Sequence, residues 1–299
     1  MWVWAAVLSA ALLGIYEVAK KRASTENGVL HVLLYATALG ALFFLPLILS
    51  SIFGWGIAEG TVFSLEKGTL EDHLLILTKS LIVTVSWILG LYALKNLPIT
   101  TAGTIKASRP VFVLLGSILI FGERLNVWQW VGVVIAIVAL FLLSVSSKKE
   151  GVDFAHNKWI VCMFGSVLSG VISALIDKKI MAWMSPIFVQ SWCNFYIAIM
   201  MAVIVIVCRF SKSRLYEHFH WDWTILWIAV FLTCSDFLYF YSLQDGSAMI
   251  SVVSLLRRCS VIVTFIAGAI LFKEHNLKSK ALELLLLLAG AAILVFGSC

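Results

Sequence analysis

Long apolar stretches follow one another along almost the whole chain, and most of the links between them are short. A helix needs about 20 apolar residues to cross roughly 30 Å of hydrocarbon, and the stretches have about that length. Short links make successive helices antiparallel neighbours. The pattern therefore predicts ten membrane-spanning helices, at 2–19, 29–53, 73–95, 99–121, 126–146, 158–180, 186–208, 223–244, 247–272 and 281–298.

One pattern occurs twice along the chain. Residues 92–126 read YALKNLPITTAGTIKASRPVFVLLGSILIFGERLN, and residues 241–276 read YSLQDGSAMISVVSLLRRCSVIVTFIAGAILFKEHN. In both copies, an arginine lies 17 positions after the opening tyrosine. Because each half holds an odd number of spans, the second half must insert upside down. The sequence predicts an all-α integral membrane protein whose ten transmembrane helices form two inverted five-helix repeats, 1–148 and 149–299, an architecture common in secondary transporters.

Composition supports a membrane protein. Of the 299 residues, 62% are hydrophobic and 13% are charged, whereas soluble domains have roughly 45–50% apolar and 25% charged residues. The net charge of +6 does not indicate nucleic acid, since the basic residues lie inside apolar stretches or in short loops, where membrane topology accounts for them. We expect a multi-pass protein of the cell (inner) membrane.

Four basic residues stand near the middle of two predicted spans. Lys106 and Arg109 lie in the fourth span, and Arg257 and Arg258 lie in the ninth. At 1.5 Å of rise per residue, all four are within about 6 Å of the bilayer midplane, where a charge costs several kcal/mol. Pro110 should kink the fourth span beside its two cations.

Central carboxylates are fewer than central cations. Asp236 is the obvious central acid, and Glu17 lies nearer the end of the first span. One arginine–Asp236 pair is expected, which leaves at least two central cations without an obvious carboxylate partner. Because unpaired buried charge is costly, a water-filled cavity that admits an anion would relieve it. The alternative is a purely structural set of ion pairs across helices.

Polar and aromatic residues accompany the cations. In the ninth span, Ser254 lies one turn before Arg258 on a polar stripe. Asp236 and Glu17 are the candidate coupling or counter-ion residues. We predict no catalytic residue, metal site or cofactor. The predicted substrate-binding residues are Lys106, Arg109, Arg257, Arg258, Ser254, Tyr92 and Tyr241.

The two copies of the repeated pattern carry a family resemblance, most clearly where they end in GERL (122–125) and KEHN (273–276). Over nearly its whole length the chain resembles the drug/metabolite transporter superfamily in its ten-helix EamA-type form. Two segments, IKASRPVFVLLGS (105–117) and LLRRCSVIV (255–263), are similar to the triose-phosphate and nucleotide-sugar translocators.

The likeness to triose-phosphate translocators implies a phosphate site. In those proteins a lysine of the fourth helix and a Lys-Arg pair of the ninth hold the substrate phosphate. By position these are Lys106, Arg257 and Arg258 here, with an arginine as the first of the pair. Arg109 stands where many relatives have an acidic or small residue.

These observations lead to one main hypothesis and two alternatives. The main hypothesis is a secondary active transporter, not an enzyme, that moves a small metabolite, an organic or phosphorylated anion, by alternating access. The alternatives are an exporter of amino acids or other zwitterionic metabolites and a flippase for a lipid-linked headgroup. The expected partners are the small-molecule substrate and membrane lipid, with no nucleic acid; a homodimer is left open.

Membrane orientation has two conflicting indicators. The links after odd-numbered spans hold 13 basic residues, including Lys20, Lys21 and Arg22, and the opposite set holds 4. The positive-inside rule then places the richer set in the cytoplasm and both termini outside. The family resemblance implies both termini inside.

Overall fold

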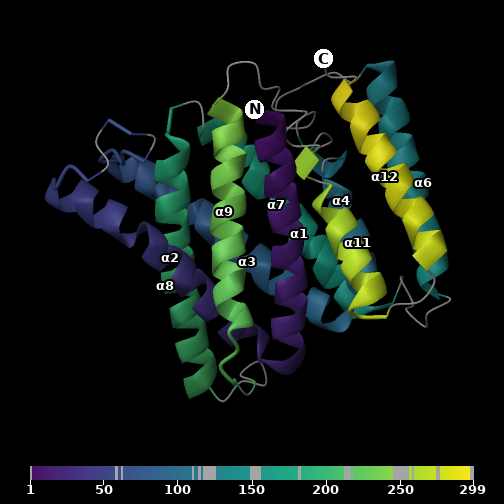
Figure 1. Ribbon diagram of the computed structural model, residues 1–299, viewed down its shortest axis with the longest axis horizontal. Coiled ribbons are helices and arrows are strands. Elements are labelled where there is room, and N and C mark those ends of the chain that lie inside the picture. Colours follow the sequence, from purple (N-terminus) through teal and green to yellow (C-terminus); the bar gives the residue numbers. More distant parts are fainter. Residues whose placement is uncertain are drawn as a thin grey trace.

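The computed structural model describes residues 2–57, 60–61, 63–109, 111–113, 116, 126–148, 156–180, 183–211, 217, 219–244, 256–257, 259–273 and 277–296. Within these residues every regular element is a helix (Figure 1). The helices are α1 (Trp2–Glu26), α2 (Val29–Phe53), α3 (Leu70–Asn96), α4 (Ile99–Ala107), α6 (Val127–Lys148), α7 (Lys158–Ile180), α8 (Pro186–Phe210), α9 (Thr224–Gln244), α11 (Ser260–Ile270) and α12 (Leu277–Phe296).

Helix ends follow local sequence signals. The expected spans 29–53 and 158–180 match α2 and α7 to the residue. The hydroxyl of Thr69 accepts a hydrogen bond from the Asp72 N–H, and the Asp72 carboxylate accepts one from the Thr69 N–H, so a capping box begins α3. Gly54, with φ of 71°, ends α2 in the left-handed conformation that glycine adopts readily.

The first helix is longer than expected. The predicted span ends at residue 19, but α1 continues to Glu26. Lys20, Lys21 and Arg22 therefore belong to the helix and not to a loop. Lys20 and Lys21 find partners inside the protein, which is why the helix can continue through them.

The fourth span is interrupted next to its cations. α4 ends at Ala107, and the N–H of Ser108 donates to the Ile105 carbonyl in a tighter turn. The interruption lies between Lys106 and Arg109, where the kink was expected; Pro110 itself is outside the described residues. α11 covers the second half of the ninth predicted span.

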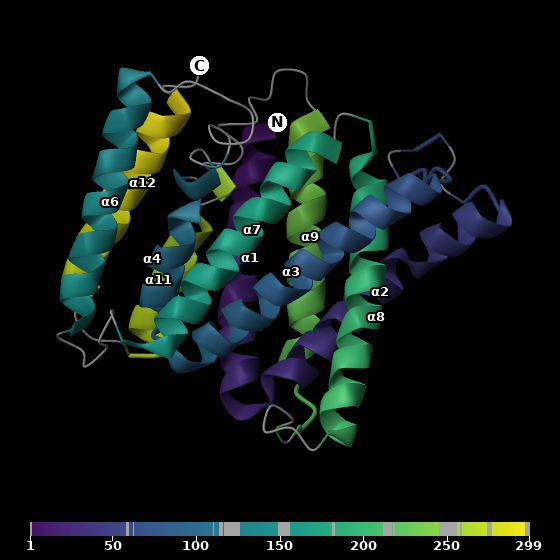
Figure 2. The same cartoon turned by 180° about the vertical axis from the view of Figure 1, so that it is seen from behind.

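Contacts between helices relate the two halves of the chain. α1 packs along α9, and its counterpart α7 packs along α3. The helix pairs α2–α8, α4–α11 and α6–α12 each join a helix of the first half to the helix five spans later (Figures 1 and 2). This matching pattern is what a two-fold relation between two five-helix units produces. Consequently, the interface between the halves runs through the centre of the molecule.

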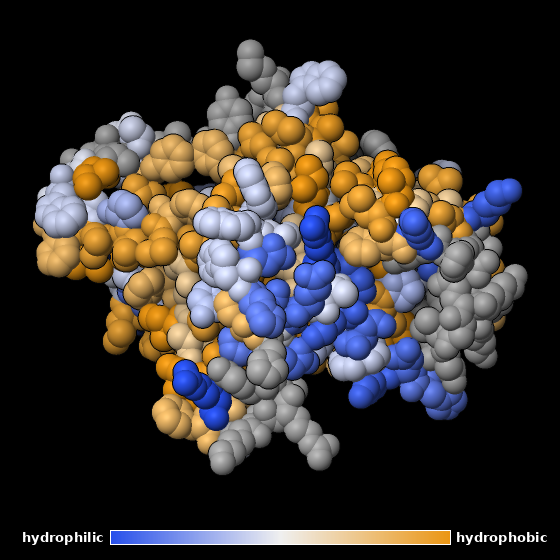
Figure 3. All heavy atoms as spheres, turned by 60° about the horizontal axis from the view of Figure 1, so that its bottom comes forward, coloured by the Kyte–Doolittle hydropathy of each residue, from blue (hydrophilic) through white to orange (hydrophobic). Residues whose placement is uncertain are grey.

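Among the described residues, five helices are long and apolar enough to cross a membrane by length and composition: α1, α2, α3, α7 and α8. Their outward sides carry large apolar residues, as suits contact with lipid. α1 begins and α12 ends on one side of the molecule. The opposite end, where α1 meets α2 and α3 meets α4, carries a cluster of hydrophilic residues (Figure 3). We call this end the basic face; its exposed residues include Arg22, Lys158 and Arg209.

Candidate functional site

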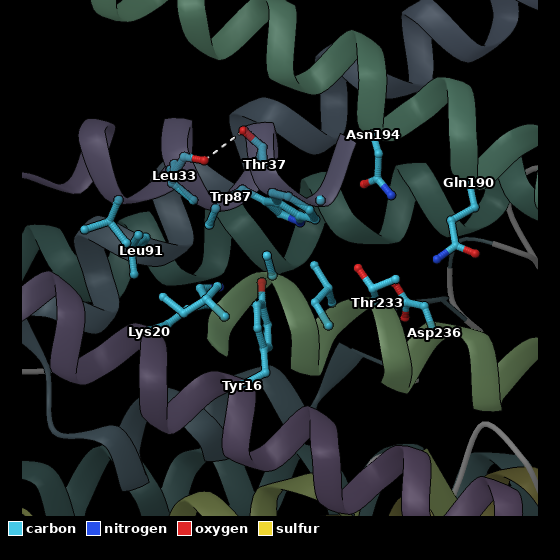
Figure 4. Close-up of a pocket in the computed structure, with 16 residues that line it drawn as sticks. Tyr16, Lys20, Leu33, Thr37, Trp87, Leu91, Gln190, Asn194, Thr233 and Asp236 are labelled. Carbon is cyan, nitrogen blue, oxygen red and sulfur yellow. Dashed lines mark hydrogen bonds between the residues drawn. The ribbon is translucent and has the colours of Figure 1, made fainter. Parts of the chain in front are cut away.

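A cavity lies between α1, α2, α3, α8 and α9, and so between the two halves (Figure 4). It contains about 470 Å³ of space between atoms, including space open to the outside. Apolar residues of α2, α3 and α9 form part of its wall, among them Leu33, Leu91 and Leu232. The other part is polar: Tyr16, Lys20, Thr37, Trp87, Gln190, Asn194, Thr233 and Asp236.

Helical spacing brings the polar side chains to the cavity. Gln190 and Asn194 are four residues apart on α8, so both amides face the same side, as Figure 4 shows. Thr233 and Asp236 occupy successive turns of α9, and Tyr16 and Lys20 do the same on α1. A ligand in the cavity would meet amides that both donate and accept hydrogen bonds, an ammonium group and a carboxylate.

Glu17 on α1 connects two lysines, of which Lys20 lines the cavity and Lys106 does not. Its Oε2 lies 2.5 Å from the Lys106 Nζ, and its Oε1 lies 3.7 Å from the Lys20 Nζ. Lys20 is only 5% exposed and its ammonium sits 4.7 Å from the centre of the Tyr16 ring. One carboxylate charge is therefore shared by two ammonium groups, that of the buried Lys20 and that of the half-buried Lys106.

Asp236 has a basic partner of its own. Its carboxylate accepts a hydrogen bond from Arg257 in an ion pair, and the guanidinium lies 4.4 Å from the centre of the Tyr239 ring. This is the arginine–Asp236 pair expected from the sequence. Asp236 reaches the cavity, whereas Arg257 is behind it.

Arg109 is held differently from the other cations. It donates to the carbonyl of Gly170 on α7, and among the described residues no carboxylate lies within ion-pair distance. A Cβ at Gly170 would come within 3.0 Å of the guanidinium carbon, so glycine makes the close approach possible. Nearby, Lys79 pairs with Asp177 at 2.7 Å.

Two of the four central cations have carboxylate partners, Arg109 has none among the described residues and Arg258 lies outside them, so the expectation of at least two unpartnered cations stays a prediction. Lys106 and Arg257 are the two with partners, because α1 runs to Glu26 and Glu17 lies deeper than the predicted span implied. An excess of positive charge nevertheless remains. In the contacts named above, five cations stand against three carboxylates, which leaves two positive charges over: Lys20, Lys79, Lys106, Arg109 and Arg257 against Glu17, Asp177 and Asp236.

Only some of the predicted site residues lie at the cavity. Asp236 lines the cavity, while Lys106, Arg109 and Arg257 do not. Tyr92 stacks on Trp159 with ring centres 6.5 Å apart, away from the cavity. Ser254, Arg258 and the side chain of Tyr241 lie outside the described residues.

The sequence did not lead us to predict several residues that line the cavity. Lys20 was counted as a loop residue, although its spacing of three from Glu17 is that of a helical ion pair. Gln190 and Asn194 carried a similar signal, since two amides four residues apart interrupt an otherwise apolar helix.

The model of the EamA-like transporter family matches the chain in two segments, residues 1–145 and 157–296. The chain belongs to the EamA-like transporter family. It is therefore a multi-pass membrane protein of a transporter family, and the expected fold of two five-helix repeats is confirmed. A solved structure, titled only as a crystal structure of a protein, has the same fold, with a TM-score of 0.62 at 14% identity over 98% of both chains. No curated protein matches the chain.

Finer expectations about this EamA-like transporter stay predictions. They comprise the boundary between residues 148 and 149, the similarity to triose-phosphate translocators, the inner membrane and the homodimer.

Proposed function

We propose that this EamA-like transporter is a secondary active carrier of a small organic anion, phosphorylated or carboxylated, that works by alternating access. The observation that carries the proposal is that the described contacts of charged side chains near the interface of the halves leave two positive charges over, and that one of their cations, Lys20, lines the polar cavity there. Uncompensated charge in the membrane interior is costly, and a bound anion would offset it.

Among the described cations, Lys20 is the one that a substrate in the cavity can reach. It lines the cavity, and at 3.7 Å its contact with Glu17 is longer than the 2.5 Å contact between Glu17 and Lys106. An anion can therefore bind Lys20 while Lys106 keeps Glu17 compensated. On the opposite wall, Gln190 and Asn194 offer hydrogen bonds to the polar body of the substrate.

The position of Asp236 supports a second candidate function, the transport of a zwitterionic metabolite. Because this carboxylate lines the same cavity as Lys20, a zwitterionic metabolite could place its ammonium group toward Asp236 and its carboxylate toward Lys20. In the anion carrier, Asp236 instead serves coupling: it takes up a proton, or the carrier exchanges one anion for another and Asp236 stays paired with Arg257.

Uptake by the full-length protein in proteoliposomes tests the proposal. The panel contains radiolabelled phosphorylated and carboxylated metabolites and amino acids, and a fluorescent lipid-linked headgroup tests for flippase activity. We expect saturable uptake of an anion and none of the lipid. Uptake of amino acids alone would favour the second candidate, and translocation of the lipid alone would overturn both.

The Lys20→Gln variant tests the site. It should lower apparent affinity for the anion by roughly 10- to 100-fold, because a hydrogen bond to a charged group contributes about 1.5–3 kcal/mol. Lys158→Gln, an exposed lysine at the start of α7, is the matched control and should transport normally. Unchanged affinity in a folded Lys20→Gln protein would remove Lys20 from the site.

A further inference from the structure

Four residues tie three parts of the chain together at the basic face. The Lys95 Nζ at the end of α3 lies 2.5 Å from the Glu217 Oε2 and 3.2 Å from the carbonyl oxygen of Asn27. The Asn27 Oδ1 accepts a hydrogen bond of 2.7 Å from the backbone N–H of His220. We call this group, Asn27, Lys95, Glu217 and His220, the latch.

The latch lies between the cavity and the basic face. On α1, Tyr16 and Lys20 line the cavity, and Asn27 follows toward the basic face. On α3, Leu91 lines the cavity one turn before Lys95. α9 shows the same order in reverse, because His220 precedes the helix and the first cavity residue of α9 is Ile228.

Aromatic side chains support the latch from α2. The Tyr35 ring stacks on Phe219 with centres 4.6 Å apart, and it meets Trp221 edge-on at 5.9 Å. His31 also stacks on Phe219, at 5.5 Å. These contacts press the segment before α9 against the first turns of α2, over the end of the cavity.

The latch joins the two halves of the chain, as the aromatic contacts from α2 do, whereas the neighbouring hydrogen bonds of Lys21 do not. Lys21 donates to the carbonyls of Leu94, Lys95 and Leu97, but all of these residues belong to the first half, so the bonds can persist when the halves move apart. Asn27 and Lys95 belong to the first half, whereas Glu217 and His220 belong to the second. Any movement that opens the basic face between the halves must break the latch.

The ion pair has the exposure that a reversible contact needs. The Lys95 side chain is 23% exposed and that of Glu217 is 36% exposed. When they separate, both charges can be hydrated, so the pair does not leave a buried charge behind.

We propose that the latch is the gate of the basic face, closed in this structure, and that separation of Lys95 from Glu217 opens the cavity to that side. The proposal rests on the carrier mechanism but not on the nature of the substrate. Its test therefore measures access to the cavity and needs no transport substrate.

The experiment measures the alkylation rate of one cavity cysteine. Thr233→Cys is placed in a full-length protein whose native cysteines are replaced, and a charged, impermeant maleimide is added to cells or to inverted membrane vesicles. A separate Thr25→Cys protein, exposed at the end of α1, identifies the preparation that presents the basic face. In that preparation, Thr233→Cys should react slowly while the latch is intact.

Charge reversal then opens and recloses the gate. Lys95→Glu and Glu217→Lys should each raise the alkylation rate at least tenfold, and the double variant should restore the slow rate because it rebuilds the pair with opposite polarity. Lys158→Glu changes an exposed charge at the start of α7, on the same face, and should have no effect.

Three results would contradict the proposal that the latch is a gate. They are fast alkylation with the latch intact, unchanged rates in folded single variants, and a double variant as reactive as the singles. Gel filtration in detergent checks folding, and Lys95→Gln with Glu217→Gln replaces any reversal that does not fold. These milder variants must also accelerate alkylation. If the gate proposal is wrong, the full-length protein should still take up an anion. The two proposals can therefore fail independently.

Discussion

The Lys106 ammonium group lies 2.5 Å from the Glu17 carboxylate and joins α4 to α1 behind the cavity wall. The same carboxylate faces Lys20, which lines the cavity. Glu17 thus holds one cation firmly and leaves the other available. This division explains how a membrane protein can keep a cation at its cavity without leaving all of its buried charge unpaired.

Removing the Glu17 charge should destabilise the protein strongly. Glu17→Gln leaves the buried Lys20 and the half-buried Lys106 without a carboxylate, and the loss should approach the roughly 3–5 kcal/mol that breaking a fully buried pair costs. Thermal unfolding followed by gel filtration with fluorescence detection measures the loss. Glu26→Gln, an exposed position on the same helix, is the control and should change stability little.

A double-mutant cycle separates the ion pair from other effects of the substitution. Because Lys106→Gln removes the charge that Glu17 compensates, the Glu17→Gln/Lys106→Gln protein should lose less stability than the two single variants together. Strictly additive losses would mean that the contact between the two side chains contributes no coupling.

Close packing of α1 on α11 gives a second prediction. A Cβ at Gly14 would lie 2.4 Å from the Val263 Cβ and 2.8 Å from the Ser260 carbonyl oxygen. Gly14→Ala should therefore force the helices apart and cost about 1–3 kcal/mol, as overpacking usually does. The loss is measured as a lower unfolding temperature in detergent.

Gly40 is the matched control for Gly14. A Cβ there meets nothing within 4 Å, although the residue is buried in α2 and lines the cavity. Gly40→Ala should be neutral or stabilise by about 0.4–1 kcal/mol, since alanine restricts the unfolded chain. Equal losses at both positions would show that the α1–α11 contact does not decide the effect.

The length of the apolar stretches predicted most of the helices. It misplaced the end of a helix where charged residues are buried. α2 matches the expected span because its apolar run ends at Phe53, just before Gly54, and α7 matches as well although its last turn holds Asp177 and two lysines. The end of α1 was misplaced because Lys20 and Lys21 look like loop residues. Lys21 instead donates to three carbonyls at the end of α3, a partner that is more than 70 residues away in sequence.

The site was predictable only in part for a related reason. Counting central charges identified Lys106, Arg257 and Asp236, which take part in the ion pairs around the cavity. Which side chains reach the cavity depends on the rotation of each helix against its neighbours. Lys20 and Gln190 face the cavity, whereas Lys106 does not. No local sequence pattern predicts how each helix is rotated against its neighbours.

Orientation in the membrane is the last prediction, and the structure changes how the charges are counted. Lys20 and Lys21 lie inside α1, and Lys280 is fully buried, with its Nζ 2.9 Å from the Thr100 hydroxyl. These residues are poor indicators of topology. Exposed cations such as Arg22 and Lys158 remain on the basic face.

We predict that the basic face lies in the cytoplasm and that both termini lie outside, because exposed basic residues in short loops and near the ends of spanning helices favour the cytoplasmic side. Thr25→Cys in a background without native cysteines tests this; its neighbour Ser24 is buried and unsuitable as a labelling site. An impermeant thiol reagent should label Thr25→Cys only after the cells are permeabilised. A cysteine replacing Glu71, exposed near the start of α3 on the opposite face, should be labelled in intact cells. The reverse result at both positions would place the termini in the cytoplasm, as the resemblance to related transporters implies.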